Sequence, residues 1–478
     1  MFFRQIYEEG LAQASFIVGS PESEEALVVD PRRDVDVYIQ AAHDNDLKIV
    51  AVTETHIHAD FLSGARELAA RTGATLCYSA MGGDDWRYRA LPADSRALAD
   101  GDVIRIGDVA VNVLHTPGHT PEHVTFVVSE DPSKGPMIAM TGDFVFVGDV
   151  GRPDLLEAAV GVAGSAAAGA REMFASLRDK FVPLPDYVQI WPGHGAGSAC
   201  GKALGAVPAS TSGYERLTAW WAPFVKAGDA AGFAAQLLDG QPDPPLYFAR
   251  MKRLNRDGAP LLGTLPNPRR FDGTRLRAAM NDGAVVIDAR VKDRFRARHV
   301  KDALSIPDEP NFATRAAWFV LDDLPIVLIA KPERVDALVR ALVRVGLDRC
   351  VGYVDADDEE TQSAVQSGAL KSIDVTAARA AWERGPAVIL DVRNSLEYRN
   401  GHIPGAMHIP ASRLLRSLDD LPRDRPLLIH CAGGGRATSA ASALAAHGFD
   451  NVVDVTGGFN AWLAAGSPTE TLEPVTPL

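Results

Sequence analysis

Short apolar runs alternate with helical patterns along the first half of the chain. The predicted strands cover residues 16–18, 26–29 and 49–53, and the predicted helices cover residues 35–43 and 62–70. Two further apolar runs, 103–106 and 109–114, flank the dipeptide Gly107-Asp108 and predict a hairpin that turns there. This alternation is typical of an α/β fold.

The pattern breaks after residue 245. Residues 246–270 are rich in Pro, Arg and Asn, which predicts a linker. The remainder of the chain repeats one frame of apolar and polar positions. Three pairs of residues lie 103 positions apart: Asp288 and Asp391, His299 and His402, Pro307 and Pro410. The sequence therefore predicts a first domain over residues 1–245 and a duplicated α/β domain over residues 271–370 and 371–478.

Composition and charge exclude several classes of function. The chain has 478 residues, of which 48 are Lys or Arg and 62 are Asp or Glu, for a net charge of −14. We expect no binding to nucleic acid or to an anionic membrane, because both require basic surface. Hydrophobic residues at 46% and charged residues at 23% are typical of globular domains. The N-terminus lacks the apolar core of a signal peptide, so we expect a cytoplasmic protein.

The chain contains four cysteines, which are Cys77, Cys200, Cys350 and Cys431. Four cysteines in a chain of this length do not form a disulfide framework. A functional cysteine is therefore expected to act as a reactive thiol. Cys77 and Cys350 lie in or beside apolar runs, and we expect both to be buried in the core.

Histidines and aspartates gather on turns that follow apolar runs in the first domain. They are His56, His58, Asp60, His119, Asp143 and His194. Open α/β sheets place their ligands just beyond the ends of strands, and these side chains are ligand types for transition metals. The pattern predicts a metal site assembled from several loops.

The series H-x-H-x-D, PGHT, TGD and a later GH resembles the metallo-β-lactamase superfamily, which implies an αββα fold. Within that superfamily, residues 148–156 (GDVGRPDLL) resemble the persulfide dioxygenases. The resemblance implies one Fe(II) per chain, held by His56, His119 and Asp143. Such a 2-His-1-carboxylate set leaves positions open for a thiolate substrate and O₂.

Position 61 departs from the superfamily pattern. That pattern, H-x-H-x-D-H, has a histidine that helps to bind a second metal, and here the residue is Phe61. A benzyl group cannot ligate, so Phe61 favours a mononuclear centre over a two-metal hydrolase. The remaining polar residues then orient ligands or substrate: His58, Asp60, His194 and Arg152. Cys200, six residues after His194, either handles sulfur beside the metal or is a small buried hydrophobic residue.

The second copy of the repeat carries a reactive-thiol motif. An apolar strand over 427–430 ends at Cys431, and a helix is predicted from Ala437. The loop between them is Ala432, Gly433, Gly434, Gly435 and Arg436. Glycine N–H groups, a helix N-terminus and an arginine all stabilise a thiolate or persulfide anion. The frame resembles rhodanese domains, and its C-x4-R loop is one residue shorter than the C-x5-R loop of cysteine phosphatases.

The first copy has lost this motif. When Arg334 is aligned with Arg436, the corresponding loop contains no cysteine and no glycine. Either Ala330 or Lys331 then occupies the position of the cysteine. We therefore expect residues 271–370 to form a rhodanese-like domain without catalytic activity.

Together, the resemblances imply a persulfide dioxygenase fused to a sulfurtransferase that acts in sulfide detoxification. The first activity would oxidise a low-molecular-weight persulfide, such as glutathione or coenzyme A persulfide, to sulfite with O₂. The second would move sulfane sulfur through Cys431 and form thiosulfate. Two alternatives remain open: a glyoxalase II-like thioester hydrolase with a rhodanese tail, and a non-catalytic sulfur carrier or sensor. We expect a homo-oligomer.

Overall fold

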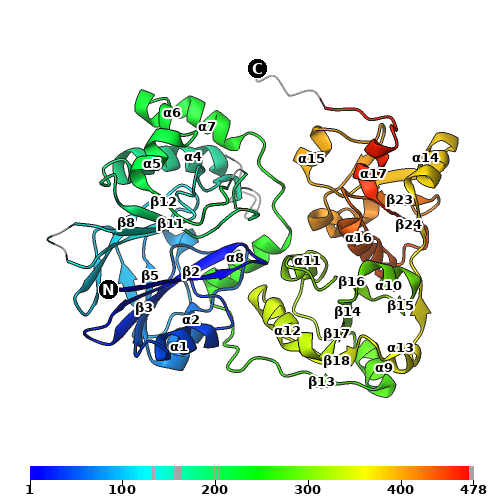
Figure 1. The fold of residues 1–478 in the computed structure, drawn as a ribbon, viewed down its shortest axis with the longest axis horizontal. Coiled ribbons are helices and arrows are strands. Elements are labelled where there is room, and N and C mark those ends of the chain that lie inside the picture. Colours follow the sequence, from blue (N-terminus) through cyan, green and yellow to red (C-terminus); the bar gives the residue numbers. More distant parts are fainter. Residues whose placement is uncertain are drawn as a thin grey trace. The chain divides into compact units, whose positions relative to one another are not determined.

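The computed structural model divides the chain into two compact units (Figure 1). Unit 1 comprises Met1–Thr264 and Val343–Gly346, and unit 2 comprises Leu265–Leu342 and Leu347–Leu478. The structure describes residues 1–131, 133, 135–155, 157, 164–198, 200–202 and 204–472, so Leu156 of the predicted 148–156 motif lies outside the described residues. Within the described ranges, no helix has both the length and the apolar character needed to cross a membrane.

Unit 1 contains two six-stranded sheets that face each other. The first follows chain order: β1 (Phe2–Glu8), β2 (Gln13–Ser20), β3 (Glu25–Val29), β4 (Lys48–Thr53), β5 (Thr75–Ser79) and β6 (Arg96–Leu98). The second has the order β12 (Ser210–Thr211), β11 (Gln189–Pro192), β10 (Ile138–Gly142), β9 (Val124–Ser129), β8 (Val109–His115) and β7 (Val103–Ile106). Phe16 and Leu27 of the first sheet pack against Val111 and Phe126 of the second in one buried cluster.

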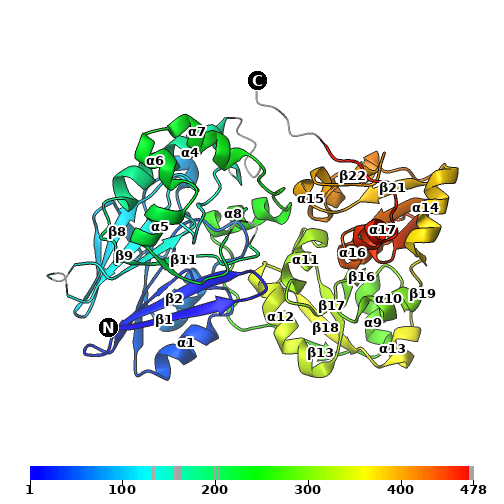
Figure 2. The same ribbon diagram turned by 45° about the horizontal axis from the view of Figure 1, so that its top comes forward.

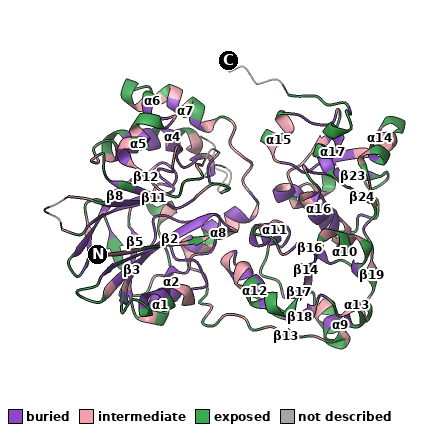
Figure 3. Ribbon diagram, viewed as in Figure 1, coloured by how far each residue is buried: buried purple, intermediate pink, exposed green. Residues whose placement is uncertain are grey.

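Helices cover the outer face of each sheet. On the first sheet lie α1 (Asp36–His43) and α2 (Ala65–Thr72), and Tyr38 and Leu68 pack there against Val28. On the second sheet lie α4 (Ser165–Ser176), α5 (Ser212–Thr218), α6 (Ala222–Ala227) and α7 (Ala230–Leu238). Met173 and Phe233 pack against Val127 on that side. The predicted αββα sandwich is confirmed, with buried strands and exposed outer faces of the helices (Figure 3).

The strands, helices and hairpin predicted in the first half of the chain are present, with boundaries that differ by up to three residues. Helix α2 begins at Ala65, whereas the hydrophobic pattern starts at residue 62. Residues before it form a tight loop, since a Cβ on Gly64 would lie 2.1 Å from the Arg32 carbonyl oxygen. This close approach of two backbones fixes the end of the loop between β4 and α2. We call this loop, residues 54–64, the metal-motif loop, because it carries His56.

The segment 246–270 differs from the expected linker. Helix α8 (Tyr247–Asp257) occupies its first part, and unit 1 extends to Thr264. Tyr247, Phe248 and Met251 are buried. The polar composition that predicted a linker belongs to a helix with one apolar face, which packs within unit 1.

Unit 2 contains the two copies of the repeat, each built on a five-stranded sheet. The first has the order β13 (Arg269–Arg270), β18 (Cys350–Asp355), β17 (Ile326–Ala330), β14 (Val285–Asp288) and β16 (Leu304–Ser305). The second has the order β20 (Ser372–Ile373), β24 (Val452–Val455), β23 (Leu427–His430), β21 (Val388–Asp391) and β22 (Met407–His408). A separate pair joins β15 (His299–Val300) to β19 (Ser367–Gly368).

The helices of unit 2 follow the same duplication (Figure 2). The first copy contains α9 (Gly273–Asn281), α10 (Lys292–Ala297), α11 (Phe312–Phe319), α12 (Val335–Arg344) and α13 (Glu359–Ser363). The second copy contains α14 (Val375–Arg384), α15 (Ser395–Arg399), α16 (Gly435–Ala446) and α17 (Gly458–Ala464).

Equivalent side chains make equivalent bonds in the two copies. Arg290 Nη2 lies 2.6 Å from Asp288 Oδ2, and Arg393 Nη2 lies 2.6 Å from Asp391 Oδ2. The predicted duplication is therefore visible in both sheet order and side-chain contacts.

Strand register also decides which residue of the first copy replaces the cysteine. Asp288 pairs with Ile329, and its equivalent Asp391 pairs with His430. The residue after Ile329 is Ala330, so Ala330 occupies the place of Cys431. The corresponding loop to Arg334 is one residue shorter than C-x4-R.

Candidate functional site

Three buried side chains from three different loops converge in unit 1. His56 follows β4, His119 follows β8 and Asp143 follows β10. Their ligand atoms all lie within 4.8 Å of one another. Asp143 Oδ2 is 3.5 Å from His119 Nε2 and 3.9 Å from His56 Nε2. The structure thus brings together the three residues for which the sequence predicts metal binding.

Hydrogen bonds fix which nitrogen of each histidine is free. His119 Nδ1 donates to the Arg152 carbonyl oxygen at 3.0 Å, which leaves Nε2 with its lone pair. His56 Nδ1 lies 3.0 Å from Thr55 Oγ1, and that hydroxyl donates its own proton to Asp30 at 2.8 Å. His56 Nδ1 therefore donates, and its Nε2 is also free. Metal-ligating histidines are oriented in this way by a hydrogen bond on the other nitrogen.

Asp143 is held by its backbone, while its carboxylate faces the Nε2 atoms of three histidines, His56, His119 and His194. The Asp143 N–H donates to His123 Nε2 at 3.1 Å, and His123 Nδ1 lies 2.9 Å from Thr116 Oγ1. Neither carboxylate oxygen has a hydrogen-bond partner among the described residues. Burial raises the pKa of Asp143 to about 6. The sequence motifs did not identify His123, which lies four residues beyond His119 and anchors the Asp143 backbone.

The donor set fits a divalent transition metal. Two neutral imidazoles present free Nε2 atoms, and a fully buried carboxylate has two oxygens with no hydrogen-bond partner in the described structure. A buried unpaired carboxylate costs free energy that a bound cation offsets. Two histidines and one carboxylate are the ligand set typical of non-haem Fe(II).

His58 is excluded from this group by another partner. Its Nε2 lies 3.0 Å from Asp30 Oδ1, and its ring packs against Phe61 with centroids 4.4 Å apart. Burial alone would lower the pKa of His58, but Asp30 outweighs burial and raises it to about 9. A protonated imidazole has no lone pair to offer a metal. His58 therefore supports the loop, as the sequence predicts for a residue outside the ligand set.

A second buried group lies beside the first. Ligand atoms of Asp60, His194 and Cys200 lie within 4.8 Å of one another. His194 Nδ1 is bonded to the Ala12 carbonyl oxygen at 3.0 Å, and Nε2 lies 3.5 Å from Asp143 Oδ1. Burial, together with Asp143 and Asp60, raises the pKa of the Cys200 thiol well above its usual value. Cys200 is thus both a buried thiol and a neighbour of the predicted metal ligands.

Arg152 contributes through its backbone and its charge. Its carbonyl oxygen accepts from His119, and its guanidinium binds the Asp154 carboxylate at 2.9 and 2.5 Å. The side chain is buried. Arg152 therefore orients a predicted ligand, which agrees with its expected position beside the metal motif.

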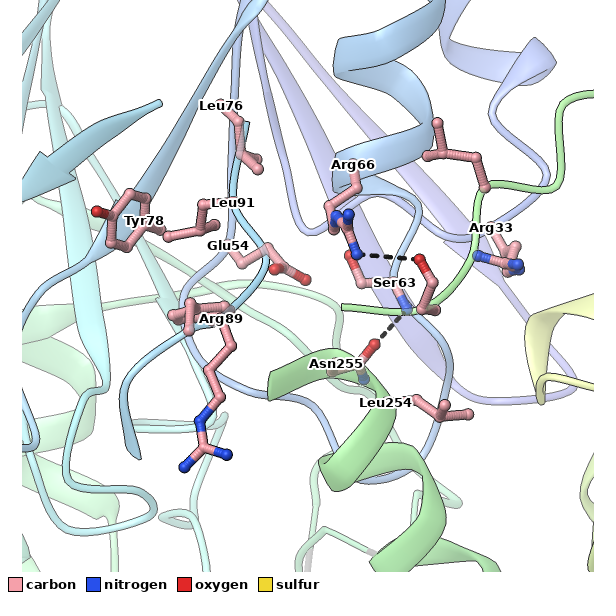
Figure 4. A pocket seen from close by; sticks show the side chains of 13 residues that line it. Arg33, Glu54, Ser63, Arg66, Leu76, Tyr78, Arg89, Leu91, Leu254 and Asn255 are labelled. Atoms are coloured by element: carbon pink, nitrogen blue, oxygen red, sulfur yellow. Dashed lines mark hydrogen bonds between the residues drawn. The ribbon is translucent and has the colours of Figure 1, made fainter. Parts of the chain in front are cut away.

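Side chains of helix α8 hold the backbone of the metal-motif loop through hydrogen bonds. The sequence did not predict these contacts. The Tyr247 hydroxyl donates to the Asp60 carbonyl oxygen at 3.0 Å. Asn255 Nδ2 donates to the carbonyl oxygens of His58 and Phe61, both at 2.8 Å. Asn255 Oδ1 also accepts from the Ser63 N–H at 2.9 Å (Figure 4). These contacts leave little trace in the sequence, because each one joins a side chain of α8 to a backbone group, which every residue type provides.

A pocket lies between this helix and β5, and Leu76 and Tyr78 of β5 line it (Figure 4). Glu54 lines it together with Arg33, Arg66 and Arg89. Burial raises the pKa of Glu54 to about 7, against the opposing effect of His58. The pocket therefore combines a buried acid with basic side chains on the α8 side of the metal-motif loop.

Lys252 is the buried cation of α8. Its ammonium has no hydrogen-bond partner among the described residues and lies 5.2 Å from the centroid of the Trp86 ring. Burial lowers the pKa of Lys252 to about 8, while Glu122 and Asp143 favour the charged form. Its charge in turn contributes, after burial, to the lowered pKa of His119. Lys252 therefore places positive charge near the predicted metal ligands.

Asn255→Ala tests the support that α8 gives to the loop. The substitution leaves three buried backbone groups without partners, so we expect a loss of about 2–4 kcal/mol in the free energy of unfolding. Urea-induced unfolding monitored by tryptophan fluorescence measures this loss. Asn112→Ala, which removes a single 3.3 Å bond to Val127, is the control and should cost about 1 kcal/mol or less. Equal losses in the two variants would contradict the assigned role.

The Cys431 loop is built at the C-terminal end of β23, where the sequence predicts it. Gly434 has φ +97° and donates its N–H to Cys431 Sγ at 3.1 Å. Phe459 and Asn460 N–H groups, at the start of α17, hold the carbonyl oxygens of Cys431 and Ala432 at 2.7 and 3.0 Å. Because α17 binds these two carbonyl oxygens, they point away from the sulfur, and the Gly434 N–H faces it.

Arg436 lies at the start of α16 and is paired with a neighbouring acid. Its Nη1 and Nη2 atoms lie 2.6 and 2.7 Å from the two oxygens of Glu397 on α15. Burial disfavours the charged guanidinium, but the hydrogen bonds to Glu397 outweigh burial and raise the pKa of Arg436. Glu397, which the sequence did not single out, therefore offsets part of the positive charge predicted for this loop.

Two family models match the chain, one in each unit. The metallo-beta-lactamase superfamily matches residues 9–194, and the rhodanese-like domain matches residues 374–465. A mitochondrial persulfide dioxygenase of Mus musculus is 28% identical over 234 residues, which is 48% of this chain and 81% of that protein. A hydroxyacylglutathione hydrolase of Haemophilus influenzae is 24% identical over 196 residues, which is 38% of this chain and 85% of that protein.

One solved structure extends over most of the chain. The crystal structure of a metallo-beta-lactamase from Staphylococcus aureus is 39% identical, with a TM-score of 0.67. The match covers 74% of this chain and 99% of that chain. The similarity therefore continues beyond the first unit.

Proposed function

Because the chain belongs to the metallo-β-lactamase superfamily and carries a C-terminal rhodanese-like domain, we propose that it is a persulfide dioxygenase coupled to a sulfurtransferase. The first activity oxidises a low-molecular-weight persulfide to sulfite. The second forms thiosulfate through Cys431. Persulfide dioxygenases among the relatives support the choice of the first substrate class.

The observation that carries the dioxygenase proposal is the composition of the metal group. His56, His119 and Asp143 form a 2-His-1-carboxylate set. Position 61, where the superfamily pattern has a histidine that helps to bind a second metal, holds Phe61, which cannot ligate, and His58 is bound to Asp30. A mononuclear centre with open positions suits O₂ chemistry better than two-metal hydrolysis.

Fe(II), when bound, supplies the redox chemistry that O₂ activation requires and that Zn(II) lacks. His56 and His119 present their Nε2 lone pairs, and Asp143 supplies negative charge. The overall reaction consumes one persulfide, one O₂ and one water, and it releases one thiol and one sulfite. The sulfur–sulfur bond breaks, the terminal sulfur is oxidised, and both atoms of O₂ are reduced.

We assign the recognition of the anionic persulfide to the buried charge of Lys252. Persulfides ionise to anions, and Lys252 offers a desolvated ammonium without a hydrogen-bond partner in the described structure. After burial, the charge of Lys252 helps to lower the pKa of His119, and Asp143 favours the charged form of Lys252. Asp60, His194 and Cys200 line the other side of Asp143.

In the proposed second reaction, the Cys431 thiolate attacks the terminal sulfur of a low-molecular-weight persulfide. The sulfur–sulfur bond of that compound breaks, its thiol leaves, and Cys431 becomes a persulfide. Sulfite then attacks the terminal sulfur, which yields thiosulfate and restores the thiolate. No net redox change is needed, because the bond between Cys431 and the sulfane sulfur breaks as the bond to sulfite forms. The Gly434 N–H, 3.1 Å from Sγ, supports an anion at this position.

The experiment that tests the proposal measures oxygen uptake on glutathione and coenzyme A persulfides, with sulfite and thiosulfate quantified together. We expect one O₂ consumed per persulfide oxidised, and thiosulfate when sulfite and persulfide are both present. A glutathione thioester serves as the competing substrate. Thioester hydrolysis without oxygen uptake would instead favour the hydrolase alternative, and no turnover of either compound would favour a sulfur carrier or sensor.

A further inference from the structure

The inactive first copy of unit 2 contacts the catalytic loop of the second copy. Helix α10 lies beside α16, the helix that begins at the loop (Figures 1 and 2). The side chain of Lys292, at the start of α10, donates to the Gly433 carbonyl oxygen at 3.4 Å. A Cβ on Gly434 would lie 3.6 Å from both Lys292 Nζ and Arg296 Nη2. Two cations of the first copy therefore border this loop.

Lys292 contacts the peptide group whose N–H donates to the Cys431 sulfur. The Gly433 carbonyl and the Gly434 N–H belong to the same planar peptide group. That N–H donates to Cys431 Sγ at 3.1 Å. A cation that binds the carbonyl oxygen polarises the peptide and fixes its orientation. Lys292 thus acts on the sulfur through a single peptide unit.

Arg296 reaches the other side of Gly434 through two buried side chains. Its Nη2 donates to Thr438 Oγ1 at 3.0 Å, and its Nε donates to Asp454 Oδ2 at 2.8 Å. Thr438 Oγ1 lies 2.9 Å from the Gly434 carbonyl oxygen and 2.7 Å from Asp454 Oδ2. Thr438 and Asp454 are both fully buried. Because a guanidinium only donates, the Thr438 proton points to Asp454 or to the Gly434 carbonyl.

We infer that the first copy is a positioning element for the active copy. Lys292 and Arg296 hold the two peptide groups that flank Gly434, and so direct the Gly434 N–H at the Cys431 sulfur. The inference rests on the proposed function, in which Cys431 holds the sulfur as an anion.

Other charged groups also surround the loop and remain unchanged in the test. Arg436 on α16 is paired with Glu397 on α15. Arg315 on α11 lies 3.4 Å from a Cβ built on Gly435 and is paired with Glu309. His430 on β23 lies 3.6 Å from Asp391, and burial lowers the pKa of His430. These groups also affect the stability of the Cys431 thiolate, and a substitution at Lys292 leaves them unchanged.

The test uses the full chain and follows alkylation of Cys431 by iodoacetamide against pH, with the peptide quantified by mass spectrometry. Only the thiolate reacts, so the midpoint of the rate profile reports its stabilisation. Lys292→Met removes the cation from a half-buried site, and Thr438→Val removes the bond to Gly434 without changing the side-chain shape. In each variant we expect the midpoint to rise by about half a pH unit, a roughly threefold change. Lys292→Arg should restore it.

Arg294→Met is the matched control. Arg294 lies on the same helix as Lys292, but it binds Asp357 and the Ala356 carbonyl. We expect no shift in the midpoint for this variant. An unchanged midpoint in Lys292→Met and Thr438→Val, or an equal shift in Arg294→Met, would overturn the inference. If the midpoint shifts as expected but the wild-type chain forms no thiosulfate, the proposed sulfur transfer fails and the positioning role stands.

Discussion

Asp143→Ala and His119→Ala are expected to reduce bound iron from about one per chain to below about 0.1, and to lower persulfide-dependent oxygen uptake at least about 100-fold. Each substitution removes one of three ligands, and the other two come from separate loops. A two-residue remnant cannot hold the metal against water. Metal analysis of the purified variants and an oxygen electrode measure the two effects. Two tightly bound zinc ions with full activity in the unmodified chain would contradict the mononuclear iron centre.

The loss should not arise from misfolding. Burial raises the pKa of Asp143 to about 6, above its value in an unfolded chain, so ionisation of this carboxylate destabilises the metal-free fold as pH rises. Removal of the carboxylate is therefore expected to leave the metal-free protein at least as stable at neutral pH. His115→Ala is the matched control, since His115 Nε2 lies 2.8 Å from the Pro121 carbonyl oxygen and belongs to neither group of ligand atoms.

The sequence could indicate the three residues proposed to hold the metal because each one is marked by its local pattern. His56 stands on a turn after a strand of the first sheet, and His119 and Asp143 stand on turns after strands of the second, so the two sheets bring them together at one edge of the sandwich. The duplication was equally visible, since a fixed spacing of 103 residues survives between Asp288 and Asp391. Both the position of these residues after apolar strands and the repeat of 103 residues can be recognised from the sequence without knowledge of side-chain packing.

Helix α8 was not predictable from its own segment. Its polar residues are typical of a linker, and only the fold reveals that Asn255 and Lys252 are buried. Asn255 bonds to backbone carbonyls about 190 residues away in sequence, and such contacts leave no pattern of paired residue types. The role of Glu397 was hidden for a related reason, because its partner Arg436 lies on another element.

The loop of the first copy shows what strand register adds to sequence alignment. The sequence left Ala330 and Lys331 as equal candidates for the position of the cysteine. Pairing of Asp288 with Ile329 selects Ala330, because Asp391 pairs with the residue directly before Cys431. A one-residue difference in loop length changes which N–H groups can face a sulfur. The alignment on Arg334 alone left that length open, and strand register was needed to determine it.

Cys431→Ser is expected to lower thiosulfate formation at least about 100-fold, while sulfite production from persulfide continues at close to the parental rate. A serine hydroxyl remains protonated at neutral pH and cannot hold a sulfane sulfur reversibly. The substitution changes one atom at a buried position, so the bond from the Gly434 N–H is kept. Separate measurement of sulfite and thiosulfate in one reaction distinguishes the two activities.

Cys350→Ala provides the control, because Cys350 is also buried in unit 2 but lies in β18 of the inactive copy. Burial raises the pKa of the Cys350 thiol to about 12, so it is not ionised near neutral pH and is unsuited to attack. This variant should form thiosulfate at the parental rate. Enzymatic thiosulfate formation by Cys431→Ser at that same rate would remove Cys431 from the reaction. Loss of sulfite production in Cys431→Ser would instead mean that the persulfide passes through Cys431 before it is oxidised.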